Sequence, residues 1–346
     1  MPIFHERNLR AAGSLAPKTG GVMASRKGIN QERFLRIVKR QVTPRWGSDY
    51  VPSILATPQE APSRSHALIL SSHKLGRGVH CLSLGEAAAA ILALYHPKLR
   101  ELHEQKMLAP WPTPHPLAGL PGSRQVGLPH LNGLIDVAER LNYLSLLPRV
   151  TVKNLEPPHN QVHVFPYVGD FLLFLAKDEG QNYCVNWSVK DTDISFKRKF
   201  AAPKRKEKEE TSTILARHEI EETYYRDAGI RTVRLAANNI NQEVVANLKQ
   251  LFLNHRTKIS LTESQRNHVR DQFRIAMDAG IPPHEVILSV CARGVVTPQD
   301  CRTVLYQAIW GRELRVDLFK PVLINRPLRP ERQDVLEVYS DWFREE

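Results

Sequence analysis

The sequence contains few cysteines and no long apolar run. Its four cysteines include no CxxC pair, which argues against a zinc framework or a disulfide scaffold and fits a reducing cytoplasm. We expect all four to be small buried apolar side chains. No apolar run approaches the roughly 18 residues that a membrane span requires, because the longest, Leu84–Tyr95, is short and carries Glu86. The first ten residues also lack the apolar core of a signal peptide.

Acidic residues are the minority among the charged ones. The chain has 48 Lys and Arg against 36 Asp and Glu, a formal net charge of +12. Such a balance favours a polyanionic partner, of which nucleic acid is the commonest. Membrane surfaces and acidic proteins attract basic chains as well, so charge alone leaves these partners open.

Length and pattern predict three regions. The 346 residues exceed one small domain, and residues 1–30 have the composition of a mobile arm. Residues 31–255 alternate helix-like and strand-like segments, which predicts an α/β domain with a Pro-rich insertion near 109–130. Over 256–346, three helical segments precede two short strand-like segments, which is the element order of a winged-helix domain.

Two strand-like segments carry the most informative polar residues. The first, GDFLLFLA, starts with Asp170 after a glycine, and the second, NYCVNWSVK, ends on Lys190. The turn-like KDEGQ between them predicts an antiparallel pair. Because side chains alternate along a strand, Asn186, Ser188 and Lys190 form a polar row opposite an apolar face. Asp170 is therefore expected beside that row.

A second carboxylate precedes these strands on a predicted helix. Ser83 can cap that helix, and Glu86 stands at the capping-box position. A strand Asp, a Lys on the next strand and a helical Glu form the layout of a metal-dependent nuclease core, since carboxylate oxygens suit Mg²⁺ and Lys can orient the attacking water. The same residues also have ordinary interpretations, because an Asp that starts a strand often caps a turn and a Lys that ends one is often solvated.

Three stretches together resemble the TnsA family, the endonuclease subunit of heteromeric cut-and-paste transposases. SLGEAAAAILALYHPKLRELHEQ is similar to the family's Glu-bearing helix and its P.v....Q ending, which maps Glu86 and Gln105. FPYVGDFLLF resembles the TPDF strand and maps Asp170, while VNWSVK maps Ser188 and Lys190. The later HEIEETYYRDAGIRTVRL resembles the helix and strand that follow in the family, including its E.E..YW region.

This resemblance implies a restriction-endonuclease-like mixed sheet of the PD-(D/E)xK type, with a winged-helix-like C-terminal domain. It implies cleavage at the 5′ ends of a mobile DNA element with Mg²⁺, for which Mn²⁺ can substitute. Glu86, Asp170 and the main-chain carbonyl of Val189 would hold the metal, and Lys190 would act on the attacking water or the phosphate. The implied partners are the DDE-type transposase TnsB and the AAA+ regulator TnsC, in the nucleoid of a bacterial cytoplasm.

Two departures from the family pattern leave alternatives open. Gly169 replaces the proline of the PD pair, and Ser188 stands where the family usually has Glu, Asp or Gln. A hydroxyl is a poorer metal ligand than a carboxylate. A weak or inactive nuclease fold that serves as a DNA-binding adaptor therefore remains an alternative, as does a restriction or repair nuclease with the same core.

A basic run directly follows the second strand. It is expected to contact DNA phosphates, although a solvated loop partly neutralised by the next acidic residues is an equal alternative. Its members are Lys197, Arg198, Lys199, Lys204, Arg205 and Lys206. Near the helix that carries Glu86, three further candidates for DNA contact are Lys74, Arg77 and His80.

Overall fold

The computed structural model describes most of the chain. The described residues are 28–63, 65–123, 125, 127–153, 160–177, 180–196, 207–292 and 294–345. The predicted arm, apart from its last three residues, and the basic run from Lys197 to Lys206 lie outside them. No helix within the described ranges combines the length and the apolar character that crossing a bilayer requires.

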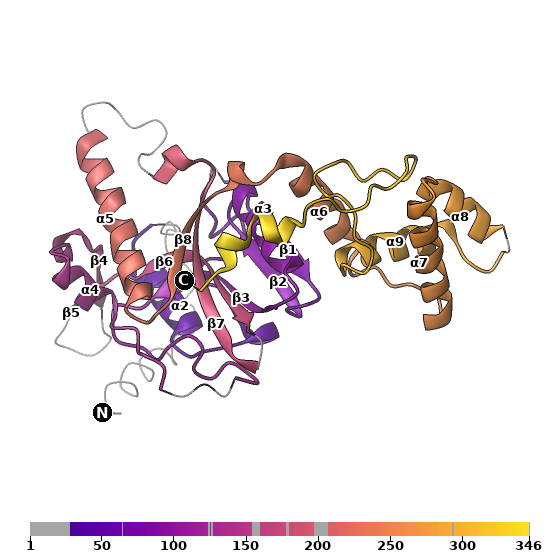
Figure 1. Cartoon of the computed structure of the whole chain (residues 1–346). Coiled ribbons are helices and arrows are strands. Elements are labelled where there is room, and N and C mark those ends of the chain that lie inside the picture. Colours follow the sequence, from indigo (N-terminus) through magenta and orange to yellow (C-terminus); the bar gives the residue numbers. More distant parts are fainter. Residues whose placement is uncertain are drawn as a thin grey trace.

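A mixed four-stranded sheet forms the centre of the molecule (Figure 1). Its strands in spatial order are β3 (Leu99–Leu108), β6 (Tyr167–Ala176), β7 (Asn182–Lys190) and β8 (Arg231–Ala236). Strands β3, β6 and β7 pair antiparallel, whereas β8 runs parallel to β7. The sequence prediction of an α/β fold with an antiparallel β6–β7 pair is confirmed.

Two small antiparallel sheets accompany the central one. Strands β1 (Leu68–Ser72) and β2 (Arg77–Cys81) form the first, and β4 (Arg149–Lys153) and β5 (Asn160–Val164) form the second. Short 3₁₀ turns lie at Gly47–Asp49, Leu144–Leu146, Asp193–Phe196, Ala237–Asn239 and Ser340–Phe343. The Pro-rich stretch after β3 is irregular, apart from one bridge between Thr113 and Leu131.

Helices cover both faces of the central sheet. On one face are α3 (Leu84–Tyr95) and α6 (Gln242–Asn254), and on the other α4 (Leu134–Arg140) and α5 (Glu207–Arg226). Alternation along the strands separates two apolar cores, since Leu173 packs with the α3 side whereas Leu172 packs with the α5 side. Helix α2 (Gln31–Gln41) covers β4 through Phe34 and Ile37. The central sheet is thus covered by helices on both faces.

The C-terminal region begins with the expected helices, α7 (Glu263–Asp278), α8 (Pro283–Cys291) and α9 (Pro298–Trp310), which extend to one side of the sheet (Figure 1). The two short strands expected after them are not present among described residues 311–345, where Val316 and Pro330 form an isolated bridge. Asn247 of α6 accounts for this difference. Its side chain donates to the carbonyls of Leu318 and Lys320 and accepts from the amide of Val322, so it satisfies backbone groups that a hairpin would pair.

The last residues return to the central sheet through α10 (Val335–Val338) and the turn that follows it. The indole Nε1 of Trp187 on β7 donates to the carbonyl of Trp342 at 2.7 Å, and the ring of Phe343 packs edge-on against Trp187 at 5.1 Å. Tyr183 donates to the carbonyl of Phe343. The C-terminus is therefore fixed to the strand that carries Lys190.

Candidate active site

Asp170 and Lys190 lie side by side where β6 and β7 diverge. The ladder between these strands reaches the pair Phe171–Trp187 and stops one residue before Asp170. There the Oδ2 atom of Asp170 accepts a hydrogen bond from the amide of Val189 at 2.7 Å, and Lys190 Nζ lies 3.4 Å from the same oxygen. The side chain of Asp170 thus takes the place of a ladder partner and is held in one orientation.

Lys190 keeps donor capacity for an external group. Its Nζ atom donates to the carbonyl of Val189 at 3.0 Å as well as contacting Asp170. An ammonium group has three donors, and 34% of this side chain is exposed. A third donor can therefore reach a water molecule or a phosphate oxygen from outside.

Glu86 is held at the first turn of α3. The Oγ atom of Ser83 accepts from the amide of Glu86 at 3.0 Å, so Ser83 caps the helix as the sequence predicts. The carboxylate of Glu86 then accepts two hydrogen bonds on one oxygen, Oε2: from the amide of Leu82 at 2.8 Å and from Nε2 of Gln105 at 3.0 Å. The other oxygen, Oε1, has no hydrogen-bond partner among the described residues.

The two carboxylates are electrostatically coupled. Burial raises the pKa of Glu86 to about 8, and the nearby negative charge of Asp170 contributes to this rise. The positive charge of Lys190 opposes it, while Asp191 adds to it. At neutral pH the Glu86 carboxyl therefore retains its proton, and a cation placed between the two acids would favour the charged form.

This raised pKa predicts a pH-dependent stability. Glu86 holds its proton in the folded state up to about pH 8 but releases it near its ordinary value of 4.5 in the unfolded chain. Rising pH between these values therefore favours unfolding by about 1.4 kcal/mol per pH unit. We expect Glu86→Gln to remove this contribution in metal-free protein. Urea titrations at pH 5, 6 and 7 measure it, and an unchanged pH slope in the variant would contradict the raised pKa of Glu86.

Ser188 and Val189 complete the strand end. Continuing the β6–β7 register by one residue places Ser188 opposite Asp170, and its side chain is buried. The carbonyl of Val189 lies beside the amine of Lys190. The ends of β6 and β7 thus bring together the site residues that the sequence predicts, which are Glu86, Asp170, Ser188, Val189 and Lys190.

Helix α5 adds two groups that sequence reasoning did not select. Glu221 is buried and accepts from Nδ2 of Asn186 at 3.1 Å. Burial raises the pKa of Glu221, and the charge of Asp170 adds to the rise. Burial also lowers the pKa of His218 to about 4, with a contribution from Lys190. The one feature of the sequence that pointed to a role for Glu221 was its place in the stretch that resembles E.E..YW.

Gly169, where the sequence departs from the family pattern, lies in a closely packed position. A Cβ atom added at Gly169 would lie 3.3 Å from Cδ1 of Leu108 and 3.4 Å from Oε1 of Glu221. The first contact is slightly shorter than an ordinary van der Waals distance, and the second is at the lower limit of that range. Glycine therefore fits this position because β3 and α5 approach the strand closely.

The oxygen atoms at the site match the preferences of a hard divalent cation. Each carboxylate has one oxygen engaged by hydrogen bonds and another without a partner in the described part of the chain. Glu86, Asp170 and the carbonyl of Val189 could hold such an ion, with water molecules as the remaining ligands. No group of three or more His, Cys, Asp and Glu side chains with metal-binding geometry occurs in the described residues, so the candidate site depends on two carboxylates.

The three additional candidates for DNA contact all form hydrogen bonds within the chain. Lys74 donates to the carbonyls of Leu94 and His96 at the C-terminal end of α3. Arg77 is buried in an ion pair with Glu104, and Nδ1 of His80 accepts from a backbone amide. The expectation that these residues face DNA is therefore wrong for Arg77 and has no support for the other two.

No family model matches the chain, and no curated protein matches it. Inference about function therefore depends on the residues of the site and their geometry.

Proposed function

We propose that the chain is a metal-dependent DNA endonuclease that cuts the 5′ ends of a transposon as the nuclease subunit of a heteromeric transposase. One observation carries this proposal. Asp170 and Lys190, from adjacent strands, and Glu86, from a helix distant in sequence, lie near one another at the strand ends, and among the described residues each carboxylate has one oxygen without a hydrogen-bond partner. The mixed sheet with helices on both faces is consistent with a restriction-endonuclease-like core.

Each side chain has a proposed part in phosphodiester hydrolysis. Glu86, Asp170 and the carbonyl of Val189 would hold Mg²⁺ or Mn²⁺. When bound, the ion supplies Lewis-acid chemistry, lowering the pKa of a water ligand and neutralising phosphate charge. Lys190 would donate a hydrogen bond to the attacking water or to the scissile phosphate. Ser188, at the position opposite Asp170, would contact a water ligand rather than the metal itself.

The proposed partners follow from charge and from the family resemblance. A net charge of +12 supports DNA as the substrate. The resemblance supports a TnsB-like DDE transposase and a TnsC-like AAA+ regulator as partners. Helices α7, α8 and α9 are proposed to form a winged-helix-like module for protein docking, because α9 carries few cations for reading DNA.

The cleavage assay combines the chain with its DDE transposase partner, a plasmid carrying the element ends, and Mg²⁺ or Mn²⁺. We expect nicks that map on denaturing gels to the 5′ ends of the element. Absence of nicks, with a transposase shown to cut the 3′ ends in the same reaction, would contradict the proposal. Cutting at unrelated sequences without the transposase would favour a restriction or repair nuclease.

Replacing the lysine separates chemistry from metal binding. We expect Lys190→Met to lower the nicking rate by about 10²- to 10³-fold, the usual cost of losing one donor to a transition state, while Mn²⁺ affinity does not fall because Lys is no metal ligand. Single-turnover nicking and calorimetric Mn²⁺ titration measure the two effects. The matched control is Lys177→Met at the far end of β6, where Lys177 pairs with Glu345 on the surface; it should keep the wild-type rate.

A DNA-binding adaptor with an inactive nuclease fold is the second candidate. Ser188 favours it, because a hydroxyl stands where the family pattern has a stronger ligand. The described residues also contain no group of three or more His, Cys, Asp and Glu side chains that could hold a metal ion together. This candidate predicts specific binding to the element ends with no cleavage in either metal, even with an active transposase partner.

A further inference from the structure

We propose that Gln105 is a positioning residue, whose side-chain amide fixes one oxygen of Glu86 so that the other oxygen is directed at the bound cation. This inference rests on the proposed function, since it assigns a role to Gln105 in the same site.

Gln105 has an unusual backbone conformation for a strand residue. Its φ is 49°, in the left-handed region, although its neighbours Glu104 and Lys106 pair regularly with Phe171 and Gly169. The register places Gln105 opposite Asp170, but these two residues do not form a ladder pair. A left-handed backbone costs a residue with a side chain about 1–2 kcal/mol, and such strain persists where the surrounding structure enforces it.

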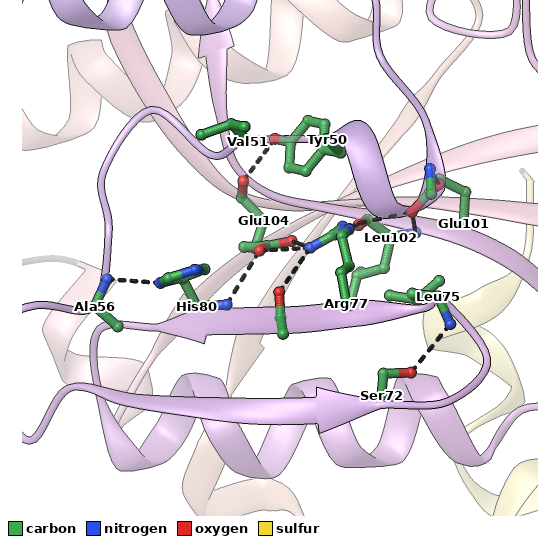
Figure 2. Close-up of polar contacts among 12 residues, drawn as sticks. Tyr50, Val51, Ala56, Ser72, Leu75, Arg77, His80, Glu101, Leu102 and Glu104 are labelled. Atoms are coloured by element: carbon green, nitrogen blue, oxygen red, sulfur yellow. Dashed lines mark hydrogen bonds and ion pairs between the residues drawn. The ribbon is translucent and has the colours of Figure 1, made fainter.

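The surrounding structure holds this part of β3 through several contacts. The hydroxyl of Tyr50 donates to the carbonyl of Glu104 at 2.7 Å, and the amide of Ser53 donates to the carbonyl of Gln105 at 3.0 Å. On the β2 side, Arg77 forms hydrogen bonds of 2.8 and 2.9 Å to the buried carboxylate of Glu104. Figure 2 shows Tyr50 and Arg77 approaching Glu104 from different directions. The backbone at Gln105 is thus fixed independently of its own side chain.

The resulting turn in β3 directs the amide of Gln105 toward α3. There Nε2 donates to Oε2 of Glu86 at 3.0 Å, and the amide of Leu82 donates to the same atom at 2.8 Å. Two donors on one oxygen fix the orientation of the carboxylate plane. Donors that orient a metal-binding carboxylate in this way typically change metal affinity by about 10- to 100-fold when they are removed. The alternative role for Gln105 is to accommodate the backbone turn and nothing more.

Replacement by glycine separates these two roles. Glycine adopts the left-handed region without steric cost, so Gln105→Gly preserves the turn while removing the amide. We expect the dissociation constant for Mn²⁺, measured by calorimetry on the full chain without DNA, to rise by about tenfold or more. An unchanged Mn²⁺ affinity in Gln105→Gly would overturn the proposal, because glycine would then replace everything that Gln105 does.

A second variant and a matched control exclude effects of packing. Gln105→Met keeps the approximate volume of the side chain and removes only the donor, so it should weaken Mn²⁺ binding as the glycine variant does. The control is Gln41→Met. Gln41 is also a buried amide beside β3, where it donates to the carbonyl of Val51 and accepts from the amide of Met107, but it does not contact Glu86. We expect Gln41→Met to lower Tm without changing the affinity for Mn²⁺. Equal losses of Mn²⁺ affinity in Gln41→Met and Gln105→Met would overturn the proposal.

The same titration on Asp170→Asn distinguishes this inference from the proposed function. If Asp170→Asn does not weaken Mn²⁺ binding, the metal site itself is overturned. If Asp170→Asn weakens binding and both Gln105 variants do not, the metal site stands and only the positioning role of Gln105 is overturned.

Discussion

Replacing Asp170 by Asn is expected to lower the rate of DNA nicking by at least about a thousandfold, or about 4 kcal/mol in activation free energy. The carbonyl oxygen of Asn can still accept the hydrogen bond that Val189 donates to Asp170 at 2.7 Å, so the local fold should persist. The variant lacks the negative charge that would attract a divalent cation and that pairs with Lys190. Single-turnover nicking of end DNA in the presence of the transposase partner measures this effect.

Two measurements make this result specific. DNA binding by Asp170→Asn should equal or exceed that of the wild type, because removing a carboxylate reduces repulsion of the phosphate backbone. The control Asp193→Asn changes an exposed acid just beyond β7, where the one side-chain hydrogen-bond partner of Asp193 among the described residues is Asn239; it should keep the rate within about twofold. A wild-type rate in Asp170→Asn would rule out the proposed site, whereas equal losses in both variants would point to a general effect of charge.

The strands of the candidate site are predictable from local pattern. The alternation in NYCVNWSVK places Trp187 in one apolar core and Asn186 on the opposite face, beside Glu221. The turn-like segment between β6 and β7 predicts the antiparallel pair that brings Asp170 close to Lys190. These features depend on side-chain period and on a short connection, both of which are local properties of the sequence.

The remaining parts of the site depend on contacts between segments distant in sequence. The left-handed turn at Gln105 is enforced by Tyr50 and Ser53, which lie more than fifty positions earlier, so no pattern within β3 reveals it. The close approach of Glu221 to Gly169 likewise depends on how α5 packs across the sheet. In the C-terminal region, Asn247 binds the backbone of a segment some seventy residues later, and the pattern of that segment alone wrongly predicted strands.

Arg77→Met is expected to lower the free energy of unfolding by about 3–5 kcal/mol, the cost of leaving a buried charge without its partner. The side chain of Arg77 is 7% exposed and that of Glu104 is fully buried. Arg77 also lies 3.4 Å from Glu101, and its guanidinium is stacked over the ring of Tyr50 at 4.6 Å. Met fills most of the space of the arginine side chain, so the loss should come from charge and hydrogen bonding and only slightly from a cavity. Chemical denaturation followed by circular dichroism measures it.

The pH dependence and two further variants test this mechanism. Burial raises the pKa of Glu104, and Arg77 opposes that rise. Without Arg77 the pKa of Glu104 in the folded state rises further above that of the wild type, so the cost of Arg77→Met should increase as the pH rises from 5 to 8. Adding Glu104→Gln should recover part of the stability, because no unpaired charge remains. Arg140→Met removes an arginine that is 47% exposed and pairs with the equally exposed Asp136 and with the less exposed Asp227, and it should cost about 1 kcal/mol. Equal costs for Arg77→Met and Arg140→Met would show that the buried network contributes no more to stability than a surface network does.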